Sequence, residues 1–231
     1  SIRRQRQMCI RDRNTDWQDE IFKTSFSTDH NVNVSGAIPH MPYRVSVSYT
    51  NENGILKTSN MERLTGAISL NPNFFDKKLN IQLNVKGIYN TNRFADTGAI
   101  GMATQYDPTQ PIYMDGNPYG NGYFMYMKSG NNPTPVDIGL ANPVSILDSK
   151  HDESTVYRSI GNAQIDYKFH FLPELRANLN LGYDVSKSEG DVIIEDNAPM
   201  TWCQGNYKTG FGENSSYYQL KRNTSVSYTH L

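Results

Sequence analysis

Long apolar runs are missing from this sequence, and the lack of them excludes one class of membrane protein. No stretch approaches the ~18 consecutive apolar residues that a transmembrane helix needs. A membrane β-barrel is not excluded, because its strands are only half apolar and look polar on average. The chain has 231 residues, which suits one domain of up to ~250 residues. Its 15 Tyr and 17 Gly favour strands and turns over helices.

The two ends of the chain read like translated adapter DNA. The string AGATGTGTATAAGAGACAG encodes Met-Cys-Ile-Arg-Asp, which occurs within residues 1–13, and its reverse complement encodes Val-Ser-Tyr-Thr-His-Leu, residues 226–231. One transposon end of sequencing-library adapters therefore accounts for both termini, and the adjoining adapter accounts for Arg3–Gln7. We interpret residues 1–13 and 226–231 as adapter-derived and assign the native domain to residues 14–225. The alternative is a basic arm that binds nucleic acid or an anionic membrane.

Little positive charge and little cysteine remain once these ends are set aside. Removing five Arg and one Asp leaves 17 Lys and Arg against 22 Asp and Glu, a net charge of -5. This charge excludes a nucleic-acid partner. Cys203 is then the single cysteine, so an internal disulfide is excluded and the redox compartment cannot be inferred.

Residues 14–225 show alternation of apolar and polar residues in one segment after another, the pattern of strands with one apolar face. The clearest case is Leu79, Ile81, Leu83 and Val85 between Asn80, Gln82 and Asn84. Seven strands are predicted in all: Asn31–Val34, Tyr43–Tyr49, Leu64–Leu70, Leu79–Lys86, Asn162–Phe171, Ala177–Ser186 and Tyr217–Thr224. The sequence therefore predicts an all-β chain.

The connections between these strands differ in length according to side. On one side they are short, at 38–42, 71–77 and 172–174. On the other they are longer, at 51–60, 92–154 and 189–214. An antiparallel meander with this asymmetry is typical of outer-membrane barrels, which have short periplasmic turns and long extracellular loops. A soluble sheet or sandwich with one wet face would give the same alternation, and it remains the alternative.

Aromatic residues gather toward the ends of the expected strands, where they would lie at the level of the lipid headgroups. They are Tyr43, Tyr49, Tyr89, Tyr167, Phe169, Phe171 and Tyr183. The pattern favours an apolar band with an aromatic girdle at each edge.

Several motifs follow one another in the first part of the chain: Asp16–Phe22 (DWQDEIF), Asp29–Gly36 (DHNVNVSG), Tyr43–Tyr49 (YRVSVSY) with Asn53-Gly54-Ile55, and Glu62-Arg63-Leu64. In this order they resemble the start of the barrel in SusC/RagA-type TonB-dependent transporters. The long loop adds Pro108–Tyr113 and Asn142-Pro143-Val144. The resemblance covers essentially all of residues 14–225. Two departures weaken it locally, since Ala37 replaces the second Gly of the usual Ser-Gly-Gly and the turn at 38–42 is rich in proline.

The resemblance implies a partial antiparallel meander from a 22-stranded transmembrane β-barrel, covering about its second to eighth strands. It implies an importer of oligosaccharides or peptides in the cell outer membrane, in contact with membrane lipid. In that family a plug domain fills the lumen, a TonB box couples the protein to the TonB complex, and a SusD-like surface lipoprotein caps the mouth. Plug and TonB box are absent from this sequence. The alternative function is a soluble or secreted carbohydrate-binding β-sandwich.

The two long loops are the candidate substrate-binding segments. Flat rings offer a large apolar area with few torsions to freeze, so they suit sugar faces and peptide side chains. The candidate residues for contact with substrate or cap are Tyr113, Tyr119, Tyr123, Phe124, Tyr126 and Trp202. The alternative is that these rings only pack the loops together.

No arrangement of residues indicates catalysis, a cofactor or a metal. The pairs Asp152/Glu153 and Glu195/Asp196 lack the alternating oxygen ligands of a calcium loop and read as solvated charge. His30, His40, His151 and His170 lack zinc-site spacing. Gly116–Gly122 lacks the Lys-Ser/Thr of a phosphate loop. We therefore expect a protein that is not an enzyme and has no cofactor.

Expressed alone, this chain should aggregate, because seven strands cannot close a barrel of this class and both edges stay open. Size-exclusion chromatography and thermal unfolding test this expectation. A monodisperse soluble monomer with a sharp unfolding transition would contradict it.

Overall fold

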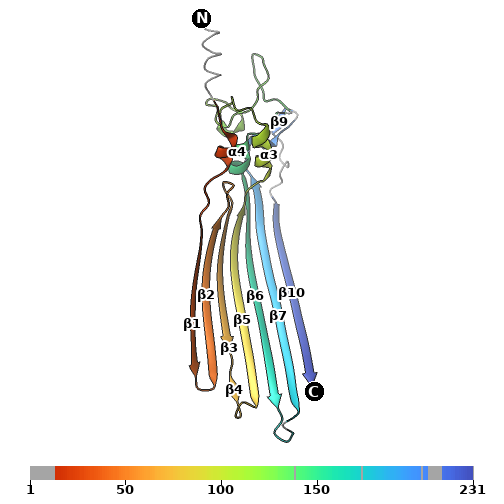
Figure 1. Ribbon diagram of the computed structural model, residues 1–231. Coiled ribbons are helices and arrows are strands. Elements are labelled where there is room, and N and C mark those ends of the chain that lie inside the picture. Colours follow the sequence, from red (N-terminus) through yellow and green to blue (C-terminus); the bar gives the residue numbers. More distant parts are fainter. Residues whose placement is uncertain (1–13, 138, 173, 204, 208–214, 231) are drawn as a thin grey trace.

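One antiparallel sheet forms the body of the computed structural model (Figure 1). The structure describes residues 14–230 except 138, 173, 204 and 208–214. Within these residues seven strands pair in the order β1-β2-β3-β5-β6-β7-β10, and the short β4 pairs with β5. The seven are β1 (Ser27–Ile38), β2 (Met41–Asn53), β3 (Asn60–Leu70), β5 (Leu79–Phe94), β6 (Lys150–Lys168), β7 (Arg176–Ile194) and β10 (Ser215–His230). Apart from the insertion of β4, β8 and β9, spatial order follows chain order, so the predicted meander is confirmed.

Shorter elements lie at the two ends of the sheet. The helices are α2 (Trp17–Ile21), α3 (Gly98–Gln105) and α4 (Pro143–Ser149), with the 3-10 turns η1 (Gly120–Gly122) and η2 (Pro199–Thr201). The remaining strands are β4 (Asn73–Phe74), β8 (Trp202–Cys203) and β9 (Asn206–Tyr207). The helices gather at one end of the sheet, and the short turns lie at the other (Figure 1). Among the described residues no helix is long and apolar enough to cross a membrane.

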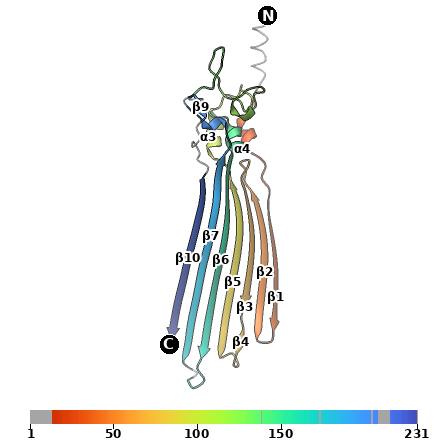
Figure 2. The same cartoon turned by 180° about the vertical axis from the view of Figure 1, so that it is seen from behind.

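The two faces of the sheet differ in polarity along every strand. Antiparallel partners point to the same face, and the register places Val45, Ile68 and Val85 in one row and Ser46, Ala67 and Lys86 in the next. The apolar face is exposed, with Val32 at 65% and Val85 at 47% of full exposure. Views from both sides show a single layer with no second sheet over it (Figure 2).

This exposed apolar face decides between the two architectures that the sequence left open. In a β-sandwich the apolar side chains of two sheets would meet in a dry interior. Here they meet one another only along the face of one sheet, as in a barrel whose outer face contacts lipid. The all-β barrel-type sheet is therefore confirmed. The described chain does not close into a barrel, since β1 and β10 are both edge strands.

Tyrosines form a row at the upper edge of the apolar band. Tyr49 faces Leu64, Leu64 faces Tyr89, and Tyr89 faces Tyr157 across successive strands. The rings of Tyr89 and Tyr157 lie 5.1 Å apart, and Lys187 beside them places its Nζ 5.9 Å from the Tyr157 ring centroid. Such a row suits the headgroup level of a membrane.

Tyr183 does not belong to either girdle. It pairs in the row of Val85, in the middle of the band, with its ring over Gly161. The expectation that it marks a strand end is wrong, because its ring covers backbone that glycine leaves bare. Tyr43 covers Gly36 in the same way on β1 and β2.

Several strand ends also differ from the predictions. β6 ends at Lys168, and Phe169 and Phe171 lie in the turn, where the Phe169 amide donates to the Leu175 carbonyl at 3.2 Å. At the other end, β5, β6 and β7 continue into the expected loops. Alternation in polarity fades there because both faces are polar once the strands rise above the apolar band.

The assignment of residues 1–13 and 226–231 to adapter DNA remains a prediction. Residues 1–13 lie outside the described residues. Strand β10 continues through Val226 to His230, where it pairs with Ala177 of β7. The segment 226–230 extends the strand because it alternates like the residues before it.

An arginine placed on the apolar face should disrupt the barrel far more than one on the polar face. We expect Val85→Arg to lower the free energy of unfolding by about 2–4 kcal/mol, the cost of Arg near the bilayer midplane. Gln82→Arg is the matched control, because Gln82 lies on the polar face of the same strand. The measurement is urea unfolding of the full-length protein in phospholipid vesicles. Equal losses for the two variants would refute the assignment of faces.

Candidate functional site

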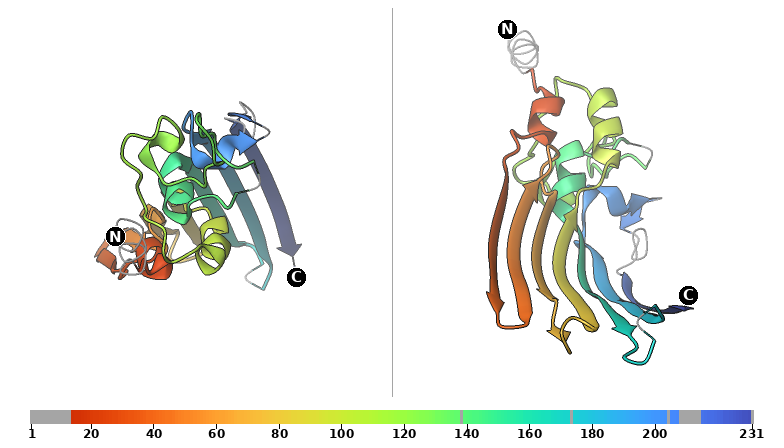
Figure 3. Two further views of the ribbon diagram at one scale, coloured as in Figure 1. Left: turned by 90° about the horizontal axis from the view of Figure 1, so that it is seen from above. Right: turned by 60° about the horizontal axis from the view of Figure 1, so that its bottom comes forward.

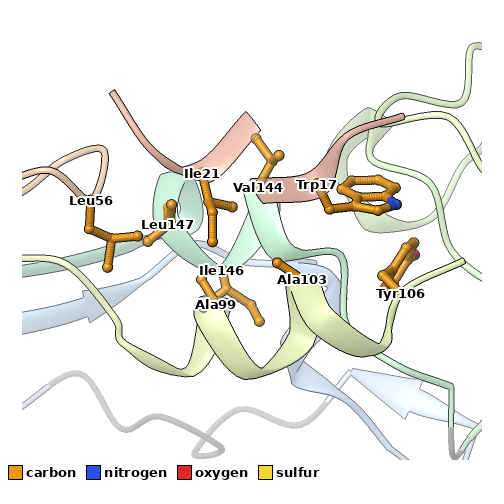
Figure 4. Close-up of a cluster of buried hydrophobic side chains, with 9 residues drawn as sticks. All are labelled: Trp17, Ile21, Leu56, Ala99, Ala103, Tyr106, Val144, Ile146 and Leu147. Atoms are coloured by element: carbon orange, nitrogen blue, oxygen red, sulfur yellow. The ribbon is translucent and has the colours of Figure 1, made fainter. Parts of the chain in front are cut away.

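The segments at the helical end of the sheet form one small domain-like cap over the strand ends, called the loop cap here (Figure 3). It consists of residues 14–26, 54–59, 95–149 and 195–207, apart from those not described. Its core holds nine buried residues (Figure 4): Trp17, Ile21, Leu56, Ala99, Ala103, Tyr106, Val144, Ile146 and Leu147. These come from three of the four segments, 14–26, 54–59 and 95–149, so burial of their side chains joins these loops into one body.

Local signals in the sequence explain two of the three helices of the cap. Asp16 caps α2 by accepting hydrogen bonds from the amides of Gln18 and Asp19. Asn142 caps α4 in the same way, and Pro143 occupies the first helical turn, where its missing N–H costs nothing. The Asn142 side-chain amide also donates to the Ile112 carbonyl at 2.9 Å. The Asn-Pro motif noted in the sequence is thus a helix start that also fixes the loop.

Trp17 anchors the first segment to the long loop. Its exposure is 3%, its Nε1 donates to the Asp107 carbonyl at 3.0 Å, and its ring meets the Tyr106 ring edge-on at 4.6 Å. Burial raises the pKa of Tyr106, so its hydroxyl stays protonated at every physiological pH.

Three of the six candidate aromatics pack against this core, namely Tyr126, Phe124 and Tyr123. The Tyr126 ring lies 5.4 Å from Tyr106 and 5.3 Å from Phe124. Both Phe124 and Tyr126 are partly buried against the core cluster. Their surroundings match the packing alternative more closely than open contact with a substrate.

Tyr113 and Tyr123 form a pair of which only Tyr113 is exposed, because Tyr123 packs against the core cluster. Their rings lie 5.2 Å apart at 37°, and their backbones form a β-bridge. The Tyr123 hydroxyl donates to Asp148 at 2.9 Å. Burial and this carboxylate raise the pKa of Tyr123, so the hydroxyl stays a donor. Tyr113 is 57% exposed and offers a ring to the outside.

The remaining two candidates, Tyr119 and Trp202, meet a third ring that sequence reasoning missed. Tyr207 lies 5.0 Å from Trp202, and Tyr119 lies 5.4 Å from Trp202. The Tyr207 hydroxyl accepts a hydrogen bond from the Gly120 amide at 2.6 Å. No local signal identifies the contact of Tyr207 with the long loop, since Tyr119 and Gly120 are more than eighty residues away in the chain.

Polar bonds tie the two long loops together. The Asn121 side-chain amide donates to the Asp196 carbonyl, and the Gly205 amide donates to Asp137, each at 2.7 Å. The six candidates thus fall into three sets on one cap: a packed set of Phe124 and Tyr126, the Tyr113–Tyr123 pair, and a cross-loop cluster. Among the described residues no group of three or more His, Cys, Asp or Glu could hold a metal ion.

Comparison with known proteins was made against families, curated sequences and solved structures. No family model matches the chain. SusC, a TonB-dependent receptor of Bacteroides thetaiotaomicron, is 40% identical over 226 residues, which covers 93% of this chain and 22% of SusC. The chain is SusC-like. The resemblance drawn from the motifs is confirmed.

Two further relatives come from Formosa agariphila. The TonB-dependent receptor P26 is 27% identical over 75% of this chain and 16% of its own length. The receptor P3 is 33% identical over 43% of this chain and 11% of its own length. The SusC-like chain thus spans about a fifth of SusC and less of the others. Outer-membrane localisation follows for it, in agreement with the apolar face of its sheet.

A solved structure has the same fold. The RagAB peptide importer in its closed-closed state superposes with a TM-score of 0.63 and 18% identity, covering 95% of this chain and 23% of that one. At this identity the likeness supports the fold alone. The meander of the SusC-like chain therefore has the fold of the matched part of that structure.

The loop cap should lose stability in acid through Asp96. Its Oδ2 accepts a hydrogen bond from Lys150 at 2.9 Å, and its Oδ1 accepts one from the Gly98 amide at 2.8 Å. Burial by itself would raise the pKa of Asp96, but these bonds and the Lys150 charge outweigh burial and lower it. The carboxylate therefore stabilises the cap fully above its unfolded pKa of about 3.9, and this contribution is lost as pH falls through the lower folded value.

Hydrogen exchange of residues 95–106 in the full-length protein, corrected for intrinsic rates, measures this loss between pH 6 and pH 2. Asp96→Asn should remove most of the pH dependence. The matched control is Asp115→Asn, since Asp115 is an exposed loop carboxylate without a side-chain hydrogen bond or ion pair among the described residues. An unchanged pH profile in Asp96→Asn would contradict the proposed role.

Proposed function

We propose that the full-length protein containing this SusC-like chain imports oligosaccharides or peptides across the outer membrane, driven by TonB. The observation that carries the proposal is the single sheet with an exposed apolar face, topped by a packed loop cap. The 40% sequence identity to SusC over 93% of the chain supports the proposal. The rival function, a soluble carbohydrate-binding sandwich, requires a second large sheet packed over the first. The described residues form only one large sheet.

Each part of the described chain has a role in this proposal. The backbone N–H and C=O groups of the strands form hydrogen bonds with one another, because lipid offers them no partners. The apolar face contacts lipid, and the polar face lines the lumen. The loop cap stands at the extracellular end, where substrate and a SusD-like lipoprotein would meet it. Coupling to TonB would use parts of the protein outside this sequence.

The proposed contact points for substrate or lipoprotein are the Tyr113–Tyr123 pair and the cross-loop cluster of Tyr119, Trp202 and Tyr207. The exposed face of Tyr113 favours this assignment, as does the Tyr123–Asp148 hydrogen bond, which holds the second ring in place. Phe124 and Tyr126 would act indirectly, by keeping the loop in shape. We propose transport without catalysis, supported by the names of the relatives as TonB-dependent receptors.

Removal of the Tyr113 ring should weaken substrate binding if that ring stacks on the substrate. A stacking contact contributes about 0.5–1.5 kcal/mol, so Tyr113→Ala should raise Kd by about two- to thirteenfold. Tyr113→Phe keeps the ring and serves as the matched control. The measurement is calorimetric titration of the detergent-solubilised full-length protein with a panel of oligosaccharides and peptides. Unchanged binding by Tyr113→Ala for every ligand bound by the unmodified protein would refute this role.

A further inference from the structure

The apolar face of the sheet carries a depression just below the tyrosine row, and its floor is bare backbone. Gly66 of β3 and Gly87 of β5 lie opposite each other in the register, and a Cβ on either glycine would meet no atom within 4 Å. The volume of the depression is about 430 Å³, and its lining includes Leu64, Tyr89 and Val185. A strip of backbone is therefore open on the lipid side between large apolar side chains.

This bare backbone is an exception on the apolar face. Two other glycines there are covered, Gly36 by the ring of Tyr43 and Gly161 by the ring of Tyr183. The pair in the depression has no such cover among the described residues. An empty depression would leave the surrounding side chains without dispersion contacts on one side. A flexible acyl chain can enter it and supply those contacts.

Two cations lie on the same apolar face beside the depression. Lys187 of β7 is part of its lining, and Arg222 of β10 pairs with Val185, in the row of the two glycines. Lys187 pairs with Leu220 and is therefore the diagonal neighbour of Arg222. Lys187 holds Glu189 at 2.8 Å, whereas Arg222 makes no ion pair within the described part of the chain. A cation on a lipid-facing surface is costly unless an anion accompanies it.

The acidic side chains of this region lie nearer the loop cap than both cations. Glu189 is two residues further along β7 than Lys187, toward the cap. The next row toward the cap holds Glu153 and Asp191 with Arg93, so it is also negative. Positive charge is therefore the layer nearest the hydrocarbon, and negative charge is the layer nearest water. An anion that approaches from the lipid side meets the cations first.

We propose that this face binds one phosphate-bearing lipid from the leaflet on the side of the loop cap. Its acyl chain would lie over Gly66 and Gly87, and its phosphate between Lys187 and Arg222. The inference rests on the proposed function, which places this face in the membrane and the cap outside. Guanidinium and ammonium groups bind phosphate through charge-assisted hydrogen bonds, and basic pockets on membrane proteins bind anionic headgroups. A docked protein would need an apolar ridge and an acid at this depth, whereas one lipid supplies chain and anion together.

Titration of the detergent-solubilised full-length protein with phosphatidic acid, followed by native mass spectrometry, tests the proposal. Phosphatidic acid offers a phosphate monoester and two acyl chains, diacylglycerol offers the chains alone, and inorganic phosphate offers the anion alone. We expect neither of the last two to displace it at equal concentration. Lys187→Gln and Arg222→Gln should each weaken binding about fivefold. Lys221→Gln is the matched control, because it removes the same charge from the polar face of β10 and should leave binding unchanged.

A second variant tests the place of the acyl chain without touching either cation. Gly87→Val fills the depression, and the open space around Gly87 accommodates the new side chain without a clash. Valine also suits a lipid-facing strand position, so the barrel should keep its stability. Binding of phosphatidic acid should fall, because its chain loses the depression.

The outcomes separate this inference from the proposed function. Equal binding of phosphatidic acid by the unmodified protein, Lys187→Gln and Arg222→Gln overturns the inference. So does displacement by inorganic phosphate, which would make the cations a site for free anions, and so does unchanged binding in Gly87→Val. A protein that imports normally but binds phosphatidic acid without need of the cations keeps the proposed function and loses the inference. A protein whose binding depends on both cations but that imports no substrate loses the proposed function and keeps the lipid site.

Discussion

The constraint on which this structure depends is that hydrocarbon offers no hydrogen-bond partner to a peptide group. Every strand from β1 to β10 must therefore be paired in continuous register, and the register fixes which side chains share a face. A slip of one residue would bring Asn84 and Lys86 into lipid and Val85 into the lumen. The alternation of residue types and the ladder of backbone bonds thus enforce the same arrangement.

The same periodicity explains what the sequence could predict. All seven strands of the sheet were found from alternation, since one face meets lipid and the other meets water. The strand ends were harder, because above the band both faces are wet. Asn51, Asn53 and Asn60 bond to one another there, and their polarity reads as loop although their backbone continues the ladder.

The loop cap does not depend on alternation of residue types, and the sequence did not predict most of its packing. Its helices are short, but their start signals are present at Asp16 and Asn142. The core is less accessible to prediction, because Trp17 meets Asp107 and Tyr106 across about ninety residues. For the same reason the sequence identified the candidate aromatics by residue type but did not predict which of them are exposed to solvent. Tyr126 and Tyr113 look alike in the sequence.

Hydrogen bonds and the chain itself connect the loop cap to the ends of the strands. Helix α4 runs directly into β6 at Ser149 and Lys150, and the Glu195 amide bonds to the Ser149 carbonyl at 2.9 Å. Lys150 also binds Asp96 at the start of the long loop. Both long loops are therefore fixed to the strand ends by hydrogen bonds as well as by the chain itself. A cap held in this way presents its rings in a preformed arrangement, which lowers the ordering cost of binding.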